Sequence, residues 1–322
     1  MIIKKKEIPI FIKKLQALLR RLPENHAKVP IIKETLSKHL AGFKGENSLD
    51  YHLSFLPEKR YYILHDIRLF HKEYYFQIDT LILAPSFILI VEVKNIAGTL
   101  FFDPVLNQFT RTLNGKDELF PNPILQTTRQ ETRLKDWLHK NKFPEIPIAS
   151  IVISSHPKAI IRTTPNYAIK LSKKVIHSDF IPERIAQFEK DYSDDIYSNT
   201  EQKKLIRTFL KKHTPKETSI LTRFQLTETD LLIGVQCPTC HHSPMKRAHG
   251  YWFCPLCSSK SKHAHKEALT DYSLLVKSTI ACREAMNYLH VSSPYVCSRL
   301  LRSTAFTFSG TKKGRLYFLI ES

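Results

Sequence analysis

Residues 76–95 read FQIDTLILAPSFILIVEVKN, and this stretch decides the fold around which the chain is built. Two apolar, β-branched runs, residues 74–83 and 87–94, flank Pro85-Ser86 and predict a β-hairpin. If the hairpin closes symmetrically about that pair, Asp79 lies directly opposite Glu92, with the two Cβ atoms about 5 Å apart. The sequence therefore predicts two carboxylates that converge on one face of a sheet.

Like charges at this separation repel each other unless one carboxyl takes up a proton or a cation lies between them. A hard divalent ion such as Mg²⁺ or Mn²⁺ resolves the conflict. Lys94 projects from the same face as Glu92, because side chains alternate along a strand. Asp79, Glu92 and Lys94 together predict a site for phosphodiester hydrolysis. The alternative is a set of ordinary solvated charges, since a bulge or an odd-length turn would separate the acids.

The flanking sequence predicts an α/β unit. Residues 31–56 have a helical pattern, interrupted near Gly42 and Gly45, and strands are expected at residues 61–65 and 107–113. Asn122 and Pro123 are a typical N-cap and first helical residue for a helix to residue 140. The apolar run at residues 148–153 follows as a buried strand. This order predicts a mixed sheet flanked by helices.

Several spaced motifs then resemble the nuclease-related domain, NERD. They are Gly45-Glu46, residues 64–66 (LHD), residues 77–81 (QIDTL), residues 91–95 (VEVKN) followed by Gly98, and residues 123–126 (PILQ). The resemblance covers roughly residues 41–155. This family is similar to the PD-(D/E)XK nucleases, whose αβββαβ core agrees with the element order above.

The resemblance assigns a role to each matching residue. Asp79 and Glu92 are then the acidic ligands of Mg²⁺ or Mn²⁺, and Lys94 is the active-site lysine. Glu46 becomes a supporting acid on one helix, and Gln126 a polar member on another.

A second metal site is predicted by cysteine spacing. Cys237-x-x-Cys240 and Cys254-x-x-Cys257 form two knuckles that can wrap one tetrahedral Zn²⁺, as in a zinc ribbon. Four thiolates leave no open coordination position, so the ion is expected to be structural. Redox disulfides are the alternative. The nearby histidines are expected to lie in solvent, and the alternative is that one of them replaces a cysteine as a ligand: His241, His242, His249, His263 and His265.

The last sixty residues predict a helix-turn-helix followed by a wing. Residues 281–289 form one helix, Ser293 and Pro294 start a second, and residues 306–308 and 315–320 alternate as strands around a basic loop. The phosphate-contacting residues are expected to be Arg299, Arg302, Lys312, Lys313 and Arg315. A small module with no affinity for DNA is the alternative.

Composition points to a polyanionic partner. The 322 residues include 49 Lys and Arg against 30 Asp and Glu, a formal net charge of +19. This excess favours nucleic acid or an acidic membrane surface. No apolar run is long enough to span a membrane, and paired cysteines fit a reducing compartment, so the sequence predicts a cytoplasmic protein without a membrane partner.

The expected organisation has five parts: an N-terminal helical extension (1–40), a NERD nuclease-like domain (41–155), a polar, partly helical connecting region (156–235), a zinc ribbon (236–262) and a winged-helix-like module (263–322). The predicted function is Mg²⁺-dependent hydrolysis of DNA, targeted by the C-terminal modules. One alternative is a non-catalytic nucleic-acid-binding protein, and another is a scaffold that binds protein partners through the ribbon.

Overall fold

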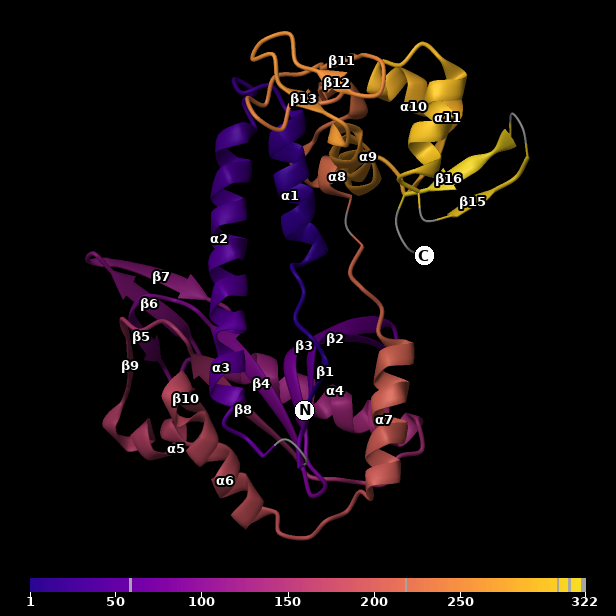
Figure 1. The fold of residues 1–322 in the computed structure, drawn as a ribbon. Helices are drawn as coiled ribbons and strands as arrows, with labels where there is room; N and C mark the ends of the chain where they lie inside the picture. The colour runs from indigo at the N-terminus through magenta and orange to yellow at the C-terminus, as the bar shows by residue number, and fades with distance from the viewer. Residues whose placement is uncertain (58–59, 218, 306, 312–313, 320–322) are drawn as a thin grey trace. The chain divides into compact units, whose positions relative to one another are not determined.

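The computed structural model describes the whole chain except residues 58, 59, 218, 306, 312, 313 and 320–322. The chain divides into two compact units, each of which is discontinuous in sequence (Figure 1). The first unit comprises residues 1–7 and 40–216, and the second comprises residues 8–39 and 217–322. The segment predicted to connect two domains, residues 156–235, is thus shared between the units.

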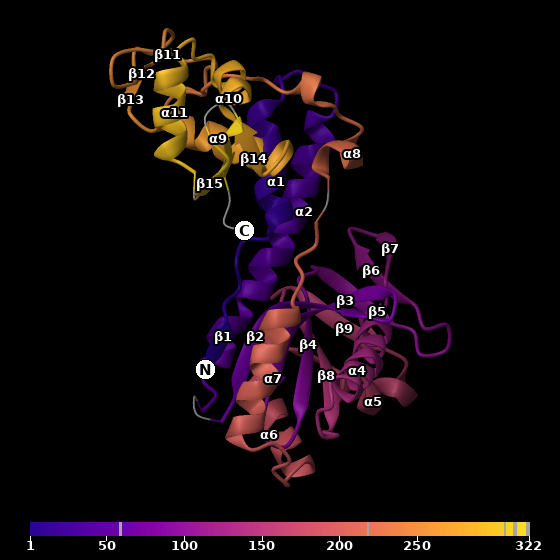
Figure 2. The same ribbon diagram turned by 90° about the vertical axis from the view of Figure 1, so that its right-hand side faces the viewer.

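A six-stranded mixed sheet forms the centre of the first unit, in the order β1-β2-β3-β4-β8-β10 (Figure 2). β2, β3 and β4 are antiparallel neighbours, whereas β4 pairs in parallel with β8 and β8 with β10. The mixed α/β class predicted from the sequence is confirmed. The strands are β1 (Ile2–Lys4), β2 (Tyr62–His71), β3 (Tyr74–Leu83), β4 (Ile88–Lys94), β8 (Ile148–Ser154) and β10 (Val175–His177).

Helices cover both faces of this sheet. On one face α4 (Pro123–Lys140) and α7 (Asn199–Lys212) bury Trp137 and Phe209 against the strands. On the other face α3 (Leu49–Leu53) and α6 (Ile181–Asp191) pack against residues such as Ile82 and Leu89. Burial on both faces explains why β4 reads as a continuous apolar run rather than an alternating one.

The register of the β3–β4 hairpin is the symmetric one predicted from the turn. Cα partners run from Leu83–Ile88 to Thr80–Val91. The regular ladder ends there, one position before Asp79 and Glu92. Glu92 continues the face of Ile88 and Ile90, which α4 covers, whereas in β3 the alternation of buried side chains is interrupted at Asp79, between Ile78 and Leu81.

Two expectations for this unit were incomplete or wrong. A helix break near Gly42 and Gly45 was wrong, because α2 (Val29–Asn47) is continuous through both glycines. A Cβ at Gly45 would lie 2.2 Å from Cβ of Asn95, so that glycine permits a close approach rather than a break.

A second sheet, of which the sequence predicted a single strand, has the order β7-β6-β5-β9. Its strands are β5 (Gly98–Phe102), β6 (Phe109–Leu113), β7 (Lys116–Phe120) and β9 (Ala159–Thr163), and α5 (Ala168–Ser172) packs nearby.

The second unit combines the N-terminal helix with the C-terminal third of the chain. α1 (Ile10–Arg21) packs with α8 (Ile220–Phe224) and α9 (Ala264–Leu275) through Leu15, Leu18 and neighbouring apolar side chains. A small sheet of β11 (Lys246–Arg247), β12 (Trp252–Phe253) and β13 (Lys260–Ser261) precedes α9. Then come β14 (Thr279–Ala281), α10 (Cys282–Leu289), α11 (Pro294–Arg302), β15 (Thr307–Ser309) and β16 (Leu316–Phe318).

The last of these elements form the predicted helix-turn-helix and wing. Ser293 caps α11 by accepting a hydrogen bond from the backbone N–H of Val296, and Pro294 is the first helical residue. β14, β16 and β15 form a three-stranded antiparallel sheet beside the two helices. Local capping and turn signals were therefore sufficient to predict this part of the fold.

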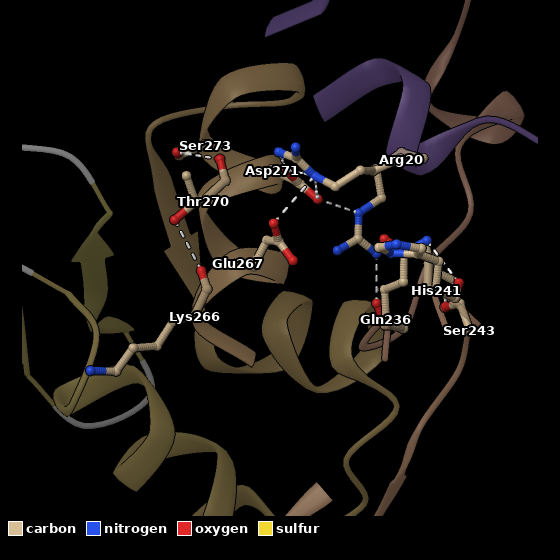
Figure 3. A network of polar contacts seen from close by, with 12 residues as sticks. Arg20, Gln236, His241, Ser243, Lys266, Glu267, Thr270, Asp271 and Ser273 are labelled. Carbon is tan, nitrogen blue, oxygen red and sulfur yellow. Dashed lines mark hydrogen bonds and ion pairs between the residues drawn. The ribbon is translucent and has the colours of Figure 1, made fainter. Parts of the chain in front are cut away.

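A buried ion-pair network connects α1 to α9 within the second unit (Figure 3). Arg20 Nη2 lies 2.5 Å from Asp271 Oδ1, and Arg21 Nε lies 2.8 Å from Asp271 Oδ2. Arg21 also donates to the carbonyl oxygen of Gly234 at 2.7 Å. Arg21 and Asp271 are both buried, so α1 is part of the core of this unit.

Among the described helices, none combines the length and the apolar character that crossing a bilayer requires.

Candidate functional site

The predicted hydrolytic residues meet where β3 and β4 leave their regular pairing. Lys94 Nζ donates to Glu92 Oε1 at 2.6 Å and to Gln126 Oε1, on α4, at 3.3 Å. Glu92 is buried, whereas Lys94 is partly exposed. The structure thus brings together Glu92, Lys94 and Gln126, three of the residues predicted from the sequence.

Asp79 lies against the same segment of β4. Its Oδ2 atom is 3.5 Å from the backbone nitrogen of Val93, the residue between Glu92 and Lys94. Burial raises the pKa of Asp79 well above its ordinary value, and the negative charges of Glu92 and Glu46 raise it further, although Lys94 and Lys6 act in the opposite direction. The charged form of Asp79 is therefore unfavourable in this environment.

A break in the neighbouring strand pair also falls at Asp79. The β2–β3 partners pass from His65–Thr80 to Ile67–Ile78, leaving Asp66 opposite Asp79 without a ladder pair. Asp66 has a left-handed backbone conformation, with a φ of 54°, and its carboxylate accepts a hydrogen bond from Gln77. Asp79 thus lies at a position where regular pairing stops on both sides of β3.

Two further residues complete the site and were missed from the sequence. Lys6 Nζ lies 2.5 Å from Glu46 Oε2, which positions the acid at the end of α2. Gln130 Nε2 lies 3.3 Å from Glu92 Oε2 and donates to the carbonyl oxygen of Gln77 at 2.8 Å. Gln130 follows Gln126 by one helical turn, so i,i+4 spacing was a usable signal. The sequence carries no comparable signal for Lys6, because this residue follows β1, whose parallel partner β2 is distant in sequence.

The donor set fits a hard divalent cation. Carboxylate oxygens are the ligands that Mg²⁺ prefers, and such an ion would stabilise the charged form of Asp79, which burial and the neighbouring acids disfavour. Across the part of the chain that the structure describes, only the cysteines bring three or more ligand atoms within 4.8 Å of one another. Asp79 and Glu92 would therefore suit an ion held by one or two carboxylates, with substrate phosphate and water as the other ligands.

We expect Asp79→Asn to raise the melting temperature of the metal-free protein at mildly alkaline pH. Because folding raises the pKa of Asp79, its contribution to stability is full below the ordinary value of 3.8 and is lost as pH rises through the folded value. An amide lacks the unfavourable charge. The gain should be a few degrees, since about 1 kcal/mol shifts the midpoint by about 2–4 °C in a domain of this size.

Thermal unfolding in EDTA at about pH 4 and about pH 8 measures this effect, because these values lie near and well above an ordinary carboxyl pKa. The difference between variant and wild type should shrink towards the acidic end. Added Mg²⁺ should stabilise the wild type alone. A variant that melts below the wild type at alkaline pH would contradict the interpretation of Asp79.

The second candidate site is a compact cluster of four cysteines. The Sγ atoms of Cys237, Cys240, Cys254 and Cys257 all lie within 4.8 Å of one another. Cys237 Sγ is 3.7 Å from Cys257 Sγ, and Cys240 Sγ is 3.5 Å from Cys254 Sγ. A tetrahedral ion with Zn–S bonds of about 2.3 Å requires sulfur atoms roughly 3.8 Å apart. The cluster therefore fits a single metal ion bound by all four residues.

Electrostatics also favour a thiolate in this cluster. Burial opposes ionisation of Cys237, but hydrogen bonds from Ser259 and from backbone amides outweigh it and lower the pKa to about 5. Thiolate is the form that binds a metal ion. Of the nearby histidines, His265 was wrongly expected to lie in solvent. It is buried, and its Nδ1 accepts a hydrogen bond from Trp252 Nε1 at 3.2 Å.

The predicted phosphate-contacting residues lie on the last helix and near the wing. Arg299 and Arg302, both on α11, are exposed. Arg315 is only partly exposed, and its guanidinium lies 4.6 Å from the ring centroid of Phe308. Lys312 and Lys313 fall outside the described residues. Of the predicted phosphate-contacting residues that the structure describes, Arg299 and Arg302 are therefore more exposed than Arg315.

The first unit is thus a mixed α/β domain in which Asp79, Glu92 and Lys94 lie near the end of the β3–β4 hairpin. Residues 41–155 match the family model of the nuclease-related domain, so this segment is a NERD domain.

One curated relative and the solved structures add further context. An uncharacterized protein of Bacillus anthracis is 25% identical over 185 residues, which make up 56% of this chain and 82% of that protein. No solved structure matches the chain significantly.

Proposed function

We propose that the NERD domain hydrolyses phosphodiester bonds in DNA with the help of Mg²⁺ or Mn²⁺. The observation that carries the proposal is the grouping of Asp79, Glu92 and Lys94, in which burial and neighbouring carboxylates raise the pKa of Asp79 and Lys94 contacts Glu92. A carboxyl with a strongly raised pKa, close to a second acid and a lysine, is typical of a functional site and suits one that binds a cation and a phosphate.

Asp79 and Glu92 would hold the ion, which supplies positive charge to the scissile phosphate and acidifies a water molecule. Gln130 fixes one oxygen of Glu92 and leaves the other near Lys94. Gln126 and Glu92 orient the Lys94 ammonium, which would offset negative charge that develops on the phosphate. Glu46, held by Lys6, adds negative charge that favours cation binding.

The second unit would bind the substrate. The cysteine cluster would hold one structural Zn²⁺, since four thiolates leave no position for water. α11 would present Arg299 and Arg302 to DNA, and Arg315, Lys312 and Lys313 would contact the backbone near the wing. Selectivity has to come from such contacts, because hydrolysis attacks a backbone shared by all sequences. Four thiols in a reduced cluster fit a cytoplasmic location.

The test is an assay of purified protein on plasmid, linear duplex and single-stranded DNA and on RNA, each with Mg²⁺, Mn²⁺ or EDTA. We expect cleavage of DNA with either metal and none in EDTA. The second candidate function is nucleic-acid binding without catalysis, which the helix-turn-helix and wing favour. Tight binding with no cleavage in either metal would select it.

A further inference from the structure

The exposed face of α7 in the first unit is a basic groove to which the site described above gives no role. The groove has a volume of about 480 Å³ and is lined by Thr200, Lys203, Lys204, Arg207, Thr208, Lys211 and Lys212. Five of these seven residues are cationic, and none is acidic. Each of the five basic residues is exposed. α7 therefore presents one sign of charge along a concave surface.

These charges are largely uncompensated within the described part of the chain, although Lys204 lies close enough to Glu201 to help lower the pKa of that acid. None of the five forms an ion pair there, and Glu201, the acid on α7, is engaged in a capping box with Ser198. Lys212 instead contacts Asn141 at 2.5 Å and lies 5.8 Å from the centroid of the Trp137 ring. Uncompensated positive charge in a groove attracts an extended polyanion.

The apolar face of α7 is already occupied. Leu205, Ile206 and Phe209 are buried in the core of the first unit, where Phe209 stacks on Trp137 with a centroid distance of 5.0 Å. Leu210 is the large apolar residue of α7 that is exposed. An amphipathic helix that binds a membrane must insert its apolar face. The exposed face of α7 is mainly cationic, which favours binding to a nucleic-acid backbone over insertion into a lipid surface.

α7 covers the same face of the central sheet as α4, the helix that supplies Gln126 to the candidate active site (Figure 1). α4 connects α7 to that site, because Gln126 contacts Lys94 and Trp137 packs against α7. Those two positions on α4 are about 16 Å apart at 1.5 Å per residue. Lys203, Arg207 and Lys211 follow one another at one-turn spacing over about 12 Å, which matches about three phosphates of one strand.

We propose that α7 is a backbone-binding track that holds nucleic acid beside the candidate active site. The assignment of that acid as the substrate rests on the proposed function, whereas binding to the track does not. The track would contact phosphates without reading bases, because lysine and arginine reach the backbone of any sequence. It would also keep the strand in place while the C-terminal module is bound elsewhere.

The test compares a triple variant, Lys203→Gln, Arg207→Gln and Lys211→Gln, with a matched triple, Lys158→Gln, Lys170→Gln and Lys173→Gln. The matched residues are exposed lysines of the same unit that lie outside α7, so both triples remove three charges. Binding of the full chain to labelled DNA is measured by fluorescence anisotropy in EDTA over a range of salt concentrations. Circular dichroism confirms that both variants are folded.

We expect the α7 triple to weaken DNA binding by about tenfold or more and to lower the slope of log affinity against log salt by about 2–3, since each phosphate contact contributes about 0.7–0.9. The matched triple should retain a slope near that of the wild type. Equal slopes for the two triples would overturn the proposal. So would loss of binding to vesicles of anionic phospholipid by the α7 triple with unchanged DNA binding, a result that assigns the groove to a membrane.

The two proposals fail in different ways. Binding is measured in EDTA and so does not depend on cleavage. A protein that cleaves no DNA but loses DNA affinity in the α7 triple would contradict the catalytic proposal and support the backbone-binding track. Metal-dependent cleavage that is unaffected by the α7 triple, with unchanged binding, would do the reverse.

Discussion

Glu92→Gln is expected to reduce metal-dependent cleavage by about a thousandfold or more. Loss of a residue that only supports a metal ligand costs about 10–100-fold, and Glu92 is proposed as a ligand itself. An amide retains the size of the side chain but removes the charge beside Lys94 and the preferred donor for a hard cation. The initial rate of plasmid nicking in Mg²⁺ measures the effect.

The matched control is Glu118→Gln, the same chemical change at an exposed acid of the second sheet. It should cleave at the wild-type rate. Lys94→Ala should resemble Glu92→Gln, because the ammonium group is proposed to offset charge in the transition state. Cleavage that survives both Glu92→Gln and Lys94→Ala arises from a contaminant or from another part of the chain.

Cys254→Ser is expected to reduce bound zinc from about one ion per chain to a small fraction of that value. Structural zinc contributes about 10–16 kcal/mol of apparent binding free energy in zinc-finger peptides, and much of this is folding free energy. Elemental analysis after gel filtration measures the metal content. Cys282→Ala, at a cysteine outside the cluster, should retain the ion. Unchanged zinc in Cys254→Ser would refute the four-thiolate site.

The structure extends this prediction beyond the ribbon. Cys237, Cys254 and Trp252 belong to the same apolar core as Leu289 and Leu301 of the helix-turn-helix. Loss of zinc should therefore lower the stability of the whole second unit, whereas the first unit has cores of its own. Thermal unfolding with and without a strong chelator should show one transition that shifts and one that stays.

Local signals were sufficient for much of the fold. The Pro85-Ser86 turn set the hairpin register, Asn122 and Pro123 set the start of α4, and the two cysteine pairs predicted a cluster that the structure assembles. In each case the residues that carry the signal are neighbours in sequence. Turn geometry, capping and chelate spacing act over a few residues, so they can be read without knowing the tertiary structure.

Features that depend on distant segments were not predictable. Lys6 reaches Glu46 only because β1 pairs with β2, about sixty residues later. The second sheet is built from strands of only five residues, such as residues 109–113 (FTRTL) and 116–120 (KDELF), which show only a weak alternation of apolar and polar side chains. Arg20 and Arg21 contact Asp271, about 250 residues later, and this tertiary contact makes the predicted N-terminal helical extension part of the second unit. Gly42 and Gly45 resembled helix breakers because glycine has a low helix propensity, which the tertiary structure overrides in α2.

The Arg21–Gly234 hydrogen bond joins residues 213 positions apart in the chain. At a synthesis rate of about 5–20 residues per second, α1 leaves the ribosome about 10–40 s before its partner exists. During that interval the apolar side of α1 has no docking surface in its own unit, while the intervening nascent chain can already fold. A truncated gene that encodes only residues 217–322 would lack this helix, so a recombinant version of the second unit needs residues 8–39 supplied by fusion or by coexpression.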